Sequence, residues 1–178
     1  IVIGSVQPMT GPNAKIGKEI TDAIEVAIDV INNPHDELGD FPFAKTEGIP
    51  NMNGVKLRLV TADHQSNPEI GATETERLIT EEDVDIILGS YESVVTKTAS
   101  VAAERLEVPF LTSTSTSDEL SERDFKWYFR TGPKDIDFVD NTVEFLDAYK
   151  SEIGIETVAT VAEDTDFGMQ FSEVFNEK

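Results

Sequence analysis

Two short segments carry small polar residues of the kind that bind charged ligands without ionised side chains. Residues 89–93, here called the serine loop, read Gly-Ser-Tyr-Glu-Ser and open a predicted helix. Residues 112–117, here called the hydroxyl loop, read Thr-Ser-Thr-Ser-Thr-Ser. A helix N-terminus can hold a carboxylate on its backbone N–H groups, while hydroxyls and carbonyls suit an ammonium. The two loops together predict a zwitterion site, although helix capping by Ser and Thr is the alternative interpretation.

Signatures of catalysis are missing from the sequence. It has no G-x-x-x-x-G-K-S/T phosphate loop, no G-x-G-x-x-G and no G-x-S-x-G motif. It also has no cysteine, which excludes a thiol nucleophile, a disulfide and Cys-ligated zinc. His35 and His64 lack the spacing of a metal-binding pair, and the acidic residues 163–166 lack the calcium-loop pattern. We therefore expect no catalytic residue, no metal and no cofactor. An enzyme built on this kind of sheet is kept as a rival hypothesis.

The charge balance excludes some partners. The chain holds 35 acidic and 14 basic residues, a formal net charge of -21. A nucleic-acid backbone would be repelled by this field, and an anionic membrane surface is disfavoured for the same reason. We expect no nucleic-acid partner, and we interpret the acidity as a solubility feature of the surface.

Apolar periodicity predicts strands that alternate with helices. Strands are predicted over residues 1–6, 55–60, 84–88 and 108–111, with helices over 16–31, 66–80 and 93–106. This order with short connections favours an α/β fold, a doubly wound parallel sheet with helices on both faces. Ligands of such sheets bind beyond the carboxyl ends of the strands, which is where both polar loops fall.

The pattern begins again after residue 132. A short strand at 127–130, a helix at 138–149, a strand at 158–161 and a helix from 166 are predicted. We therefore predict a first ligand-binding lobe over residues 1–131, incomplete at its C-terminal return, and the start of a second, similar lobe over 132–178. Because such a piece cannot bury both sheet faces, the natural protein is expected to be longer. A chain that opens inside a strand also predicts a signal peptide already removed.

Six short segments resemble one known family. The segments are residues 9–17, 63–68, 88–90, 108–110, 129–131 and 164–168. They resemble motifs of type I periplasmic binding proteins of the leucine/isoleucine/valine-binding family, and they occur in the same order and at approximately the same spacing as in that family. Each segment alone is weak evidence for the family, but the six segments together span essentially the whole chain. The resemblance implies two lobes joined by a hinge, which close on a ligand and present it to a membrane permease.

The resemblance also implies a role for three polar residues. Ser93 matches a serine that binds the ligand carboxylate through its backbone and hydroxyl. Thr114 matches a residue whose carbonyl accepts from the ligand ammonium, and Thr116 matches a threonine that bonds both ends.

Three further positions match residues that contact the rest of the ligand. Tyr91 and Ile16 match positions that touch the ligand side chain, and Phe167 matches an aromatic residue of the second lobe that closes over it. Two departures leave ligand specificity open. Ile16 stands where some members carry an aromatic residue, and Glu92 where others carry a smaller or uncharged one.

The function implied is the extracytoplasmic substrate-binding protein of an ABC importer. Its expected ligand is an amino acid, branched-chain or otherwise apolar, and its expected partner is an ABC permease. We expect a monomer in the periplasm or an equivalent extracytoplasmic space, with lipid anchoring of the full-length precursor left open. Two alternatives remain: a ligand-sensing domain of a receptor or regulator, and a binder of amides, urea or aromatic acids.

Overall fold

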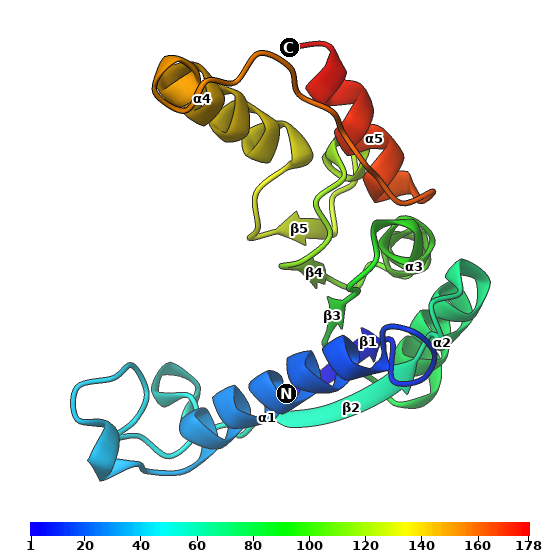
Figure 1. Ribbon diagram of the computed structural model, residues 1–178. Coiled ribbons are helices and arrows are strands. Elements are labelled where there is room, and N and C mark those ends of the chain that lie inside the picture. The colour runs from blue at the N-terminus through cyan, green and yellow to red at the C-terminus, as the bar shows by residue number, and fades with distance from the viewer.

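The computed structural model describes residues 1–178 and contains one five-stranded parallel sheet (Figure 1). Its strand order is β2-β1-β3-β4-β5. The strands are β1 (Val2–Gln7), β2 (Arg58–Asp63), β3 (Ile86–Gly89), β4 (Phe110–Thr112) and β5 (Tyr128–Arg130). Every pair of neighbouring strands is parallel, which confirms the predicted α/β class.

Helices follow the strands along the chain. They are α1 (Ala14–Asn32), α2 (Pro68–Glu81), α3 (Ser93–Arg105), α4 (Asp135–Ile153) and α5 (Asp166–Asn176). Local capping explains two of the starts. The Asn67 side chain accepts from the backbone of Glu69 and Ile70 before α2, and Thr165 accepts from the Gly168 N–H before α5. No helix has both the length and the apolar composition needed to cross a membrane.

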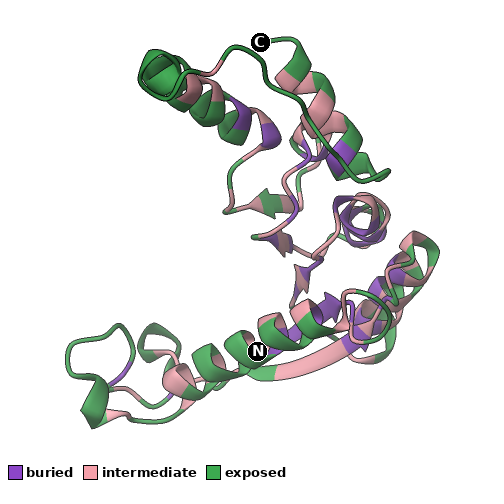
Figure 2. Cartoon of the chain, in the orientation of Figure 1, coloured by how far each residue is buried: buried purple, intermediate pink, exposed green.

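The hydrophobic core lies between the sheet and the pair α2 and α3 (Figure 2). Its buried members are Val6, Ala62, Leu78, Val84, Ile87, Ala99, Ala103 and Phe110. Helices α2 and α3 pack closely because Gly71 has no side chain: a Cβ there would lie 2.4 Å from Cγ1 of Val95. Helix α1 packs on β1 and β2, and α4 and α5 lie together at the β5 end of the sheet (Figure 1).

The second strand begins later in the chain than the sequence predicted. The alternation of residues 55–60 was assigned to a strand, but β2 runs from Arg58 to Asp63. Val55 instead forms an isolated antiparallel bridge with Ile49 around the turn at Asn53 and Gly54. The sheet therefore uses the later part of the segment, which brings Asp63 level with Gln7 at the end of β1.

The predicted strand at residues 158–161 is wrong for this structure. The segment is irregular, with Val158 53% and Val161 99% exposed. A strand requires a neighbour for its backbone N–H and C=O groups, and this segment pairs with none. The division of the chain into lobes at residues 131 and 132 stays a prediction.

Candidate functional site

The serine loop and the hydroxyl loop meet at the carboxyl ends of the neighbouring strands β3 and β4. The carbonyl of Ser90 accepts from the hydroxyls of Ser115 at 2.8 Å and Thr114 at 3.1 Å. Both donors come from the hydroxyl loop, so a single carbonyl joins the two loops. Parallel pairing of β3 with β4 is what brings the loops to one edge.

A buried hydroxyl on α3 lies at the centre of this junction. The Thr96 hydroxyl oxygen lies 2.6 Å from Oγ of Ser115 and accepts from the Ser90 N–H at 3.0 Å. Thr96, Ser90 and Ser115 are all buried. The sequence placed Ser115 in the hydroxyl loop without giving it a role of its own, and it did not indicate Thr96 at all. The only available signal was the position of Thr96 in the first turn of the helix that Ser93 opens.

The three polar residues expected to hold the ligand occupy this same edge. Ser93 is the first residue of α3 and is only 5% exposed, and its hydroxyl oxygen accepts from the Ser117 N–H at 3.4 Å. The carbonyl of Thr116 accepts from the N–H of Asp135 at 2.9 Å. The Thr114 hydroxyl donates to the Ser90 carbonyl, so Ser93 and Thr114 each join the serine loop to the hydroxyl loop, whereas Thr116 joins the hydroxyl loop to the start of α4.

The three residues expected to contact the ligand side chain come from separate elements. Tyr91 is half-buried in the serine loop, and Ile16 is half-buried in the first turn of α1. Phe167 is 40% exposed on α5, where its ring lies 6.0 Å from that of Phe171. Helix α5 approaches the hydroxyl loop through Gln170, whose side-chain oxygen accepts from the Ser117 hydroxyl. Phe167 lies one helical turn before Gln170, so both face the same side of α5.

Glu92 occupies a more enclosed position than a surface carboxylate would. Its side chain is 16% exposed. One carboxylate oxygen accepts from the Asn13 amide at 2.8 Å and from the Ser66 hydroxyl at 2.6 Å. The other lies 3.3 Å from Nε2 of His64, without hydrogen-bond geometry. Glu92 therefore links the loops that follow β1, β2 and β3.

His64 is fully buried beneath that carboxylate. Its Nδ1 accepts from the Ser66 N–H at 3.1 Å, so in the neutral ring the proton resides on Nε2, which lies 3.3 Å from Glu92 without a hydrogen bond to it. Burial lowers the pKa of His64 below its usual value of 6.5, against the opposing charges of Glu92 and Asp63. The imidazole is therefore uncharged at neutral pH.

Asp63 fixes the loop that follows β1. Its carboxylate accepts from the Met9 N–H at 2.8 Å, the Thr10 hydroxyl at 2.6 Å and the Gln65 N–H at 2.9 Å. Partial burial acts to raise the pKa of Asp63, but these hydrogen bonds outweigh it and lower the pKa below the usual value. Asp63, the first residue of the family-like segment 63–68, therefore holds the backbone of the loop after β1 in place.

Asp135, at the start of α4, is a buried acid that sequence reasoning missed. It is fully buried, and the nearby Thr116 hydroxyl does not reach full hydrogen-bond geometry with either carboxylate oxygen. Burial raises the pKa of Asp135, the nearby Asp118 raises it further, and the Thr116 hydroxyl and Arg130 oppose the change. No sequence pattern distinguishes this aspartate from the exposed acids around it.

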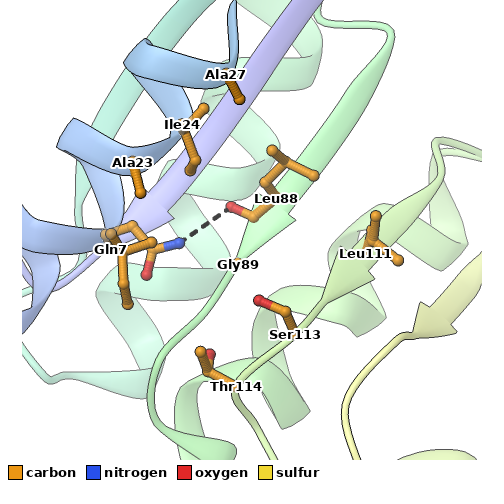
Figure 3. A pocket seen from close by; sticks show the side chains of 10 residues that line it. Gln7, Ala23, Ile24, Ala27, Leu88, Gly89, Leu111, Ser113 and Thr114 are labelled. Atoms are coloured by element: carbon orange, nitrogen blue, oxygen red, sulfur yellow. Dashed lines mark hydrogen bonds between the residues drawn. The ribbon is translucent and has the colours of Figure 1, made fainter. Parts of the chain in front are cut away.

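A groove of about 380 Å³ opens beside the hydroxyl loop on the α1 face of the sheet (Figure 3). Its apolar walls come from Ile20, Ile24 and neighbouring alanines of α1, and from Leu88 and Leu111 of β3 and β4. The Gln7 amide crosses it to the Leu88 carbonyl at 3.5 Å (Figure 3). Thr114 is the one predicted site residue among its lining.

The fold and the two loops define a class of doubly wound α/β proteins with a polar edge at the carboxyl ends of the strands. The sequence model of the family described as periplasmic binding protein matches residues 1–177. The chain belongs to this family, in its type I leucine/isoleucine/valine-binding group. It is a family of solute-binding proteins, for which an extracytoplasmic location is implied.

Relatives and solved structures agree with this assignment. The chain is 30% identical over 174 residues to Leu/Ile/Val-binding protein homolog 7 of Brucella abortus (strain 2308), covering 94% of this chain and 39% of the relative. A leucine binding protein LivK from Thermotoga maritima superposes with a TM-score of 0.79 at 22% identity, over 99% of this chain and 45% of that one. A solute binding protein of an ABC transporter from R. palustris, in complex with 4-hydroxybenzoate, gives a TM-score of 0.75 at 22% identity over 99% and 42%. The chain therefore spans less than half the length of these proteins.

Proposed function

We propose that the chain is part of an extracytoplasmic substrate-binding protein of an ABC importer, which captures an amino acid that is branched-chain or otherwise apolar. The observation that carries this proposal is the junction of the serine loop with the hydroxyl loop. It combines a helix N-terminus and a row of hydroxyls and carbonyls at one sheet edge. The name of the Brucella abortus relative supports the ligand class.

The uncharged groups of this edge suit a zwitterion. The first backbone N–H groups of α3 have no partner within the helix and can receive the ligand carboxylate beside Ser93. The carbonyl of Thr114 and the hydroxyl of Thr116 can accept from the ammonium. Tyr91, Ile16 and Phe167 contact the ligand side chain. Residues 132–178 begin a second lobe that closes over the ligand and excludes water.

The proposal also covers enzymatic activity, the partner protein and the location, because a substrate-binding protein captures its ligand without converting it. We propose that the protein is not an enzyme, which is supported by the family of solute-binding proteins to which the chain belongs. An ABC permease receives the ligand, and the binding protein acts as an extracytoplasmic monomer. The R. palustris structure with 4-hydroxybenzoate favours one second candidate, the capture of an aromatic acid at the same edge.

A ligand screen tests the proposal. The complete gene product is heated with each amino acid and with a set of small carboxylic acids, and hits are measured by calorimetry. A saturating ligand stabilises the folded state by a few kcal/mol, about 2.7 kcal/mol at a concentration of about 100 times Kd. The absence of a shift with every amino acid would refute the zwitterion site.

A double variant then assigns the residues. Ser93→Ala with Thr116→Ala is expected to abolish measurable binding of the best amino acid while the circular dichroism spectrum stays unchanged. Ser113→Ala is the matched control, because Ser113 belongs to the same hydroxyl loop but is exposed. Unchanged affinity in the double variant would remove Ser93 and Thr116 from the site.

A further inference from the structure

A carboxylate stands immediately before the helix N-terminus that is expected to hold the ligand. Glu92 is the residue that precedes α3, and Ser93 is the first residue of that helix. The side chain is held in place by hydrogen bonds from the Asn13 amide and the Ser66 hydroxyl, and it lies against the ring of His64. Because these partners come from the loops after β1 and β2, Glu92 cannot turn outward without breaking bonds to two other elements.

No basic residue neutralises this carboxylate. Its two hydrogen-bond donors, Asn13 and Ser66, are uncharged, and no Lys or Arg lies within 4 Å of it. His64 is the one basic side chain within 4 Å of it, and burial lowers the pKa of that ring, which leaves the ring neutral at pH 7. The negative charge of Glu92 therefore acts on whatever binds beside Ser93.

The nearest cations of this edge are occupied elsewhere. Arg130 donates to the carbonyl of Ser117 at 2.8 Å, and its charge acts on Asp135. Lys97 on α3 is 2.7 Å from Glu119. A ligand that carries only a carboxylate would thus meet an uncompensated like charge, whereas a zwitterion brings its own positive charge.

We propose that Glu92 is a specificity-determining residue that makes this site select ligands with a positive charge beside their carboxylate and reject plain carboxylic acids. The inference rests on the proposed function and deepens it, because it chooses between amino acids and aromatic acids. Glu92 also lets the site discriminate between ligands: the N-terminus of α3 attracts any carboxylate, and Glu92 weakens that attraction unless an ammonium accompanies the carboxylate.

The test compares ligands that differ only in the ammonium. Calorimetry on the complete gene product measures Kd for leucine, for 4-methylpentanoate, which lacks the amino group of leucine, and for 4-hydroxybenzoate. Glu92→Gln keeps acceptor oxygen for Asn13 and Ser66 but removes the charge. It is expected to tighten both plain acids at least about tenfold relative to leucine, because a like-charge pair that water largely screens already has an effect of about this order. Glu92→Ser, a smaller uncharged residue, should shift the ratio in the same direction.

A matched control and two outcomes keep the inference separate from the proposed function. Glu81→Gln at the end of α2 changes the net charge equally but lies at an exposed position, and it should leave the ratio unchanged. If the wild type binds leucine or another amino acid and both Glu92 variants leave the ratio as it was, Glu92 does not determine specificity. If the wild type binds the plain acids instead of amino acids, or binds neither class, the zwitterion site fails as well.

Discussion

The Ser115 hydroxyl offers a direct test of how the two site loops are joined. It lies 2.6 Å from Oγ1 of Thr96 and donates to the Ser90 carbonyl at 2.8 Å, in a position that is 2% exposed. Ser115→Ala removes both contacts, together with a longer one of 3.4 Å to the Tyr91 carbonyl, and creates almost no space. The Ser90 carbonyl keeps Thr114 at 3.1 Å, so it is not left wholly unsatisfied.

The expected cost combines two terms. One net intramolecular hydrogen bond contributes about 1 kcal/mol, and a buried group left short of a partner costs about 1–3 kcal/mol. Because the Ser90 carbonyl retains a donor, we expect the lower end of this range, a total of about 2 kcal/mol in the free energy of unfolding. Urea unfolding of the complete gene product, followed by circular dichroism, measures it.

A control variant and a double-mutant cycle show whether the loss of stability comes from the Ser115 hydroxyl. Ser113→Ala alters an exposed serine of the same hydroxyl loop and should change stability by less than about 0.5 kcal/mol. Combining Ser115→Ala with Thr96→Ala should reveal a coupling on the order of 1 kcal/mol, since the two hydroxyls share a bond. Equal costs for Ser115→Ala and Ser113→Ala would refute the view that this contact holds the loops together.

Two further predictions concern the buried titratable groups. Burial raises the pKa of Asp135 above 3.8, so ionisation of Asp135 destabilises the folded state as pH rises through that raised pKa. Asp135→Asn should therefore be about 1 kcal/mol more stable than the wild type at pH 7, and this gain should vanish toward pH 3.8. The pKa of His64 is lowered from 6.5 by burial, so the unfolded state gains a proton first and stability falls as pH drops below 6.5. His64→Gln should therefore lose about 1 kcal/mol less than the wild type when pH is lowered from 7 toward the depressed pKa.

Each of these two pH predictions has a control residue of the same type in the same chain. Asp124→Asn changes an exposed aspartate and should show no pH-dependent gain; a gain equal to that of Asp135→Asn would contradict the role of burial. The pKa of His35 is raised, first through its hydrogen bond with Glu37, so His35 adds stability at low pH that is lost as pH rises. His35→Gln should thus respond to acidification with the opposite sign to His64→Gln, and identical slopes would refute both assignments.

Several features of the fold could be predicted from local sequence alone. The start of α2 at Pro68 and of α3 at Ser93 follow from capping residues and apolar spacing, which act within a few residues. The parallel sheet follows from the order of elements. That order also places the serine loop and the hydroxyl loop at the ends of neighbouring strands. The sequence thus determined the class of fold, the family and the polar character of this edge.

The tertiary structure decided what each side chain at that edge contacts. In the sequence, Glu92 does not differ from other acids at helix starts. In the structure, the loops that follow β1 and β2 bring Asn13, Ser66 and His64 next to it, although Asn13 is 79 residues away along the chain. Asp135 is buried by the approach of α4, and Thr96 becomes central only because the hydroxyl loop lies across it. The segment at 158–161 has a strand-like sequence, yet it forms no strand without a neighbour. Periodicity and capping report on contacts within a helix or strand, whereas burial, charge pairing and strand partners depend on residues distant in the chain.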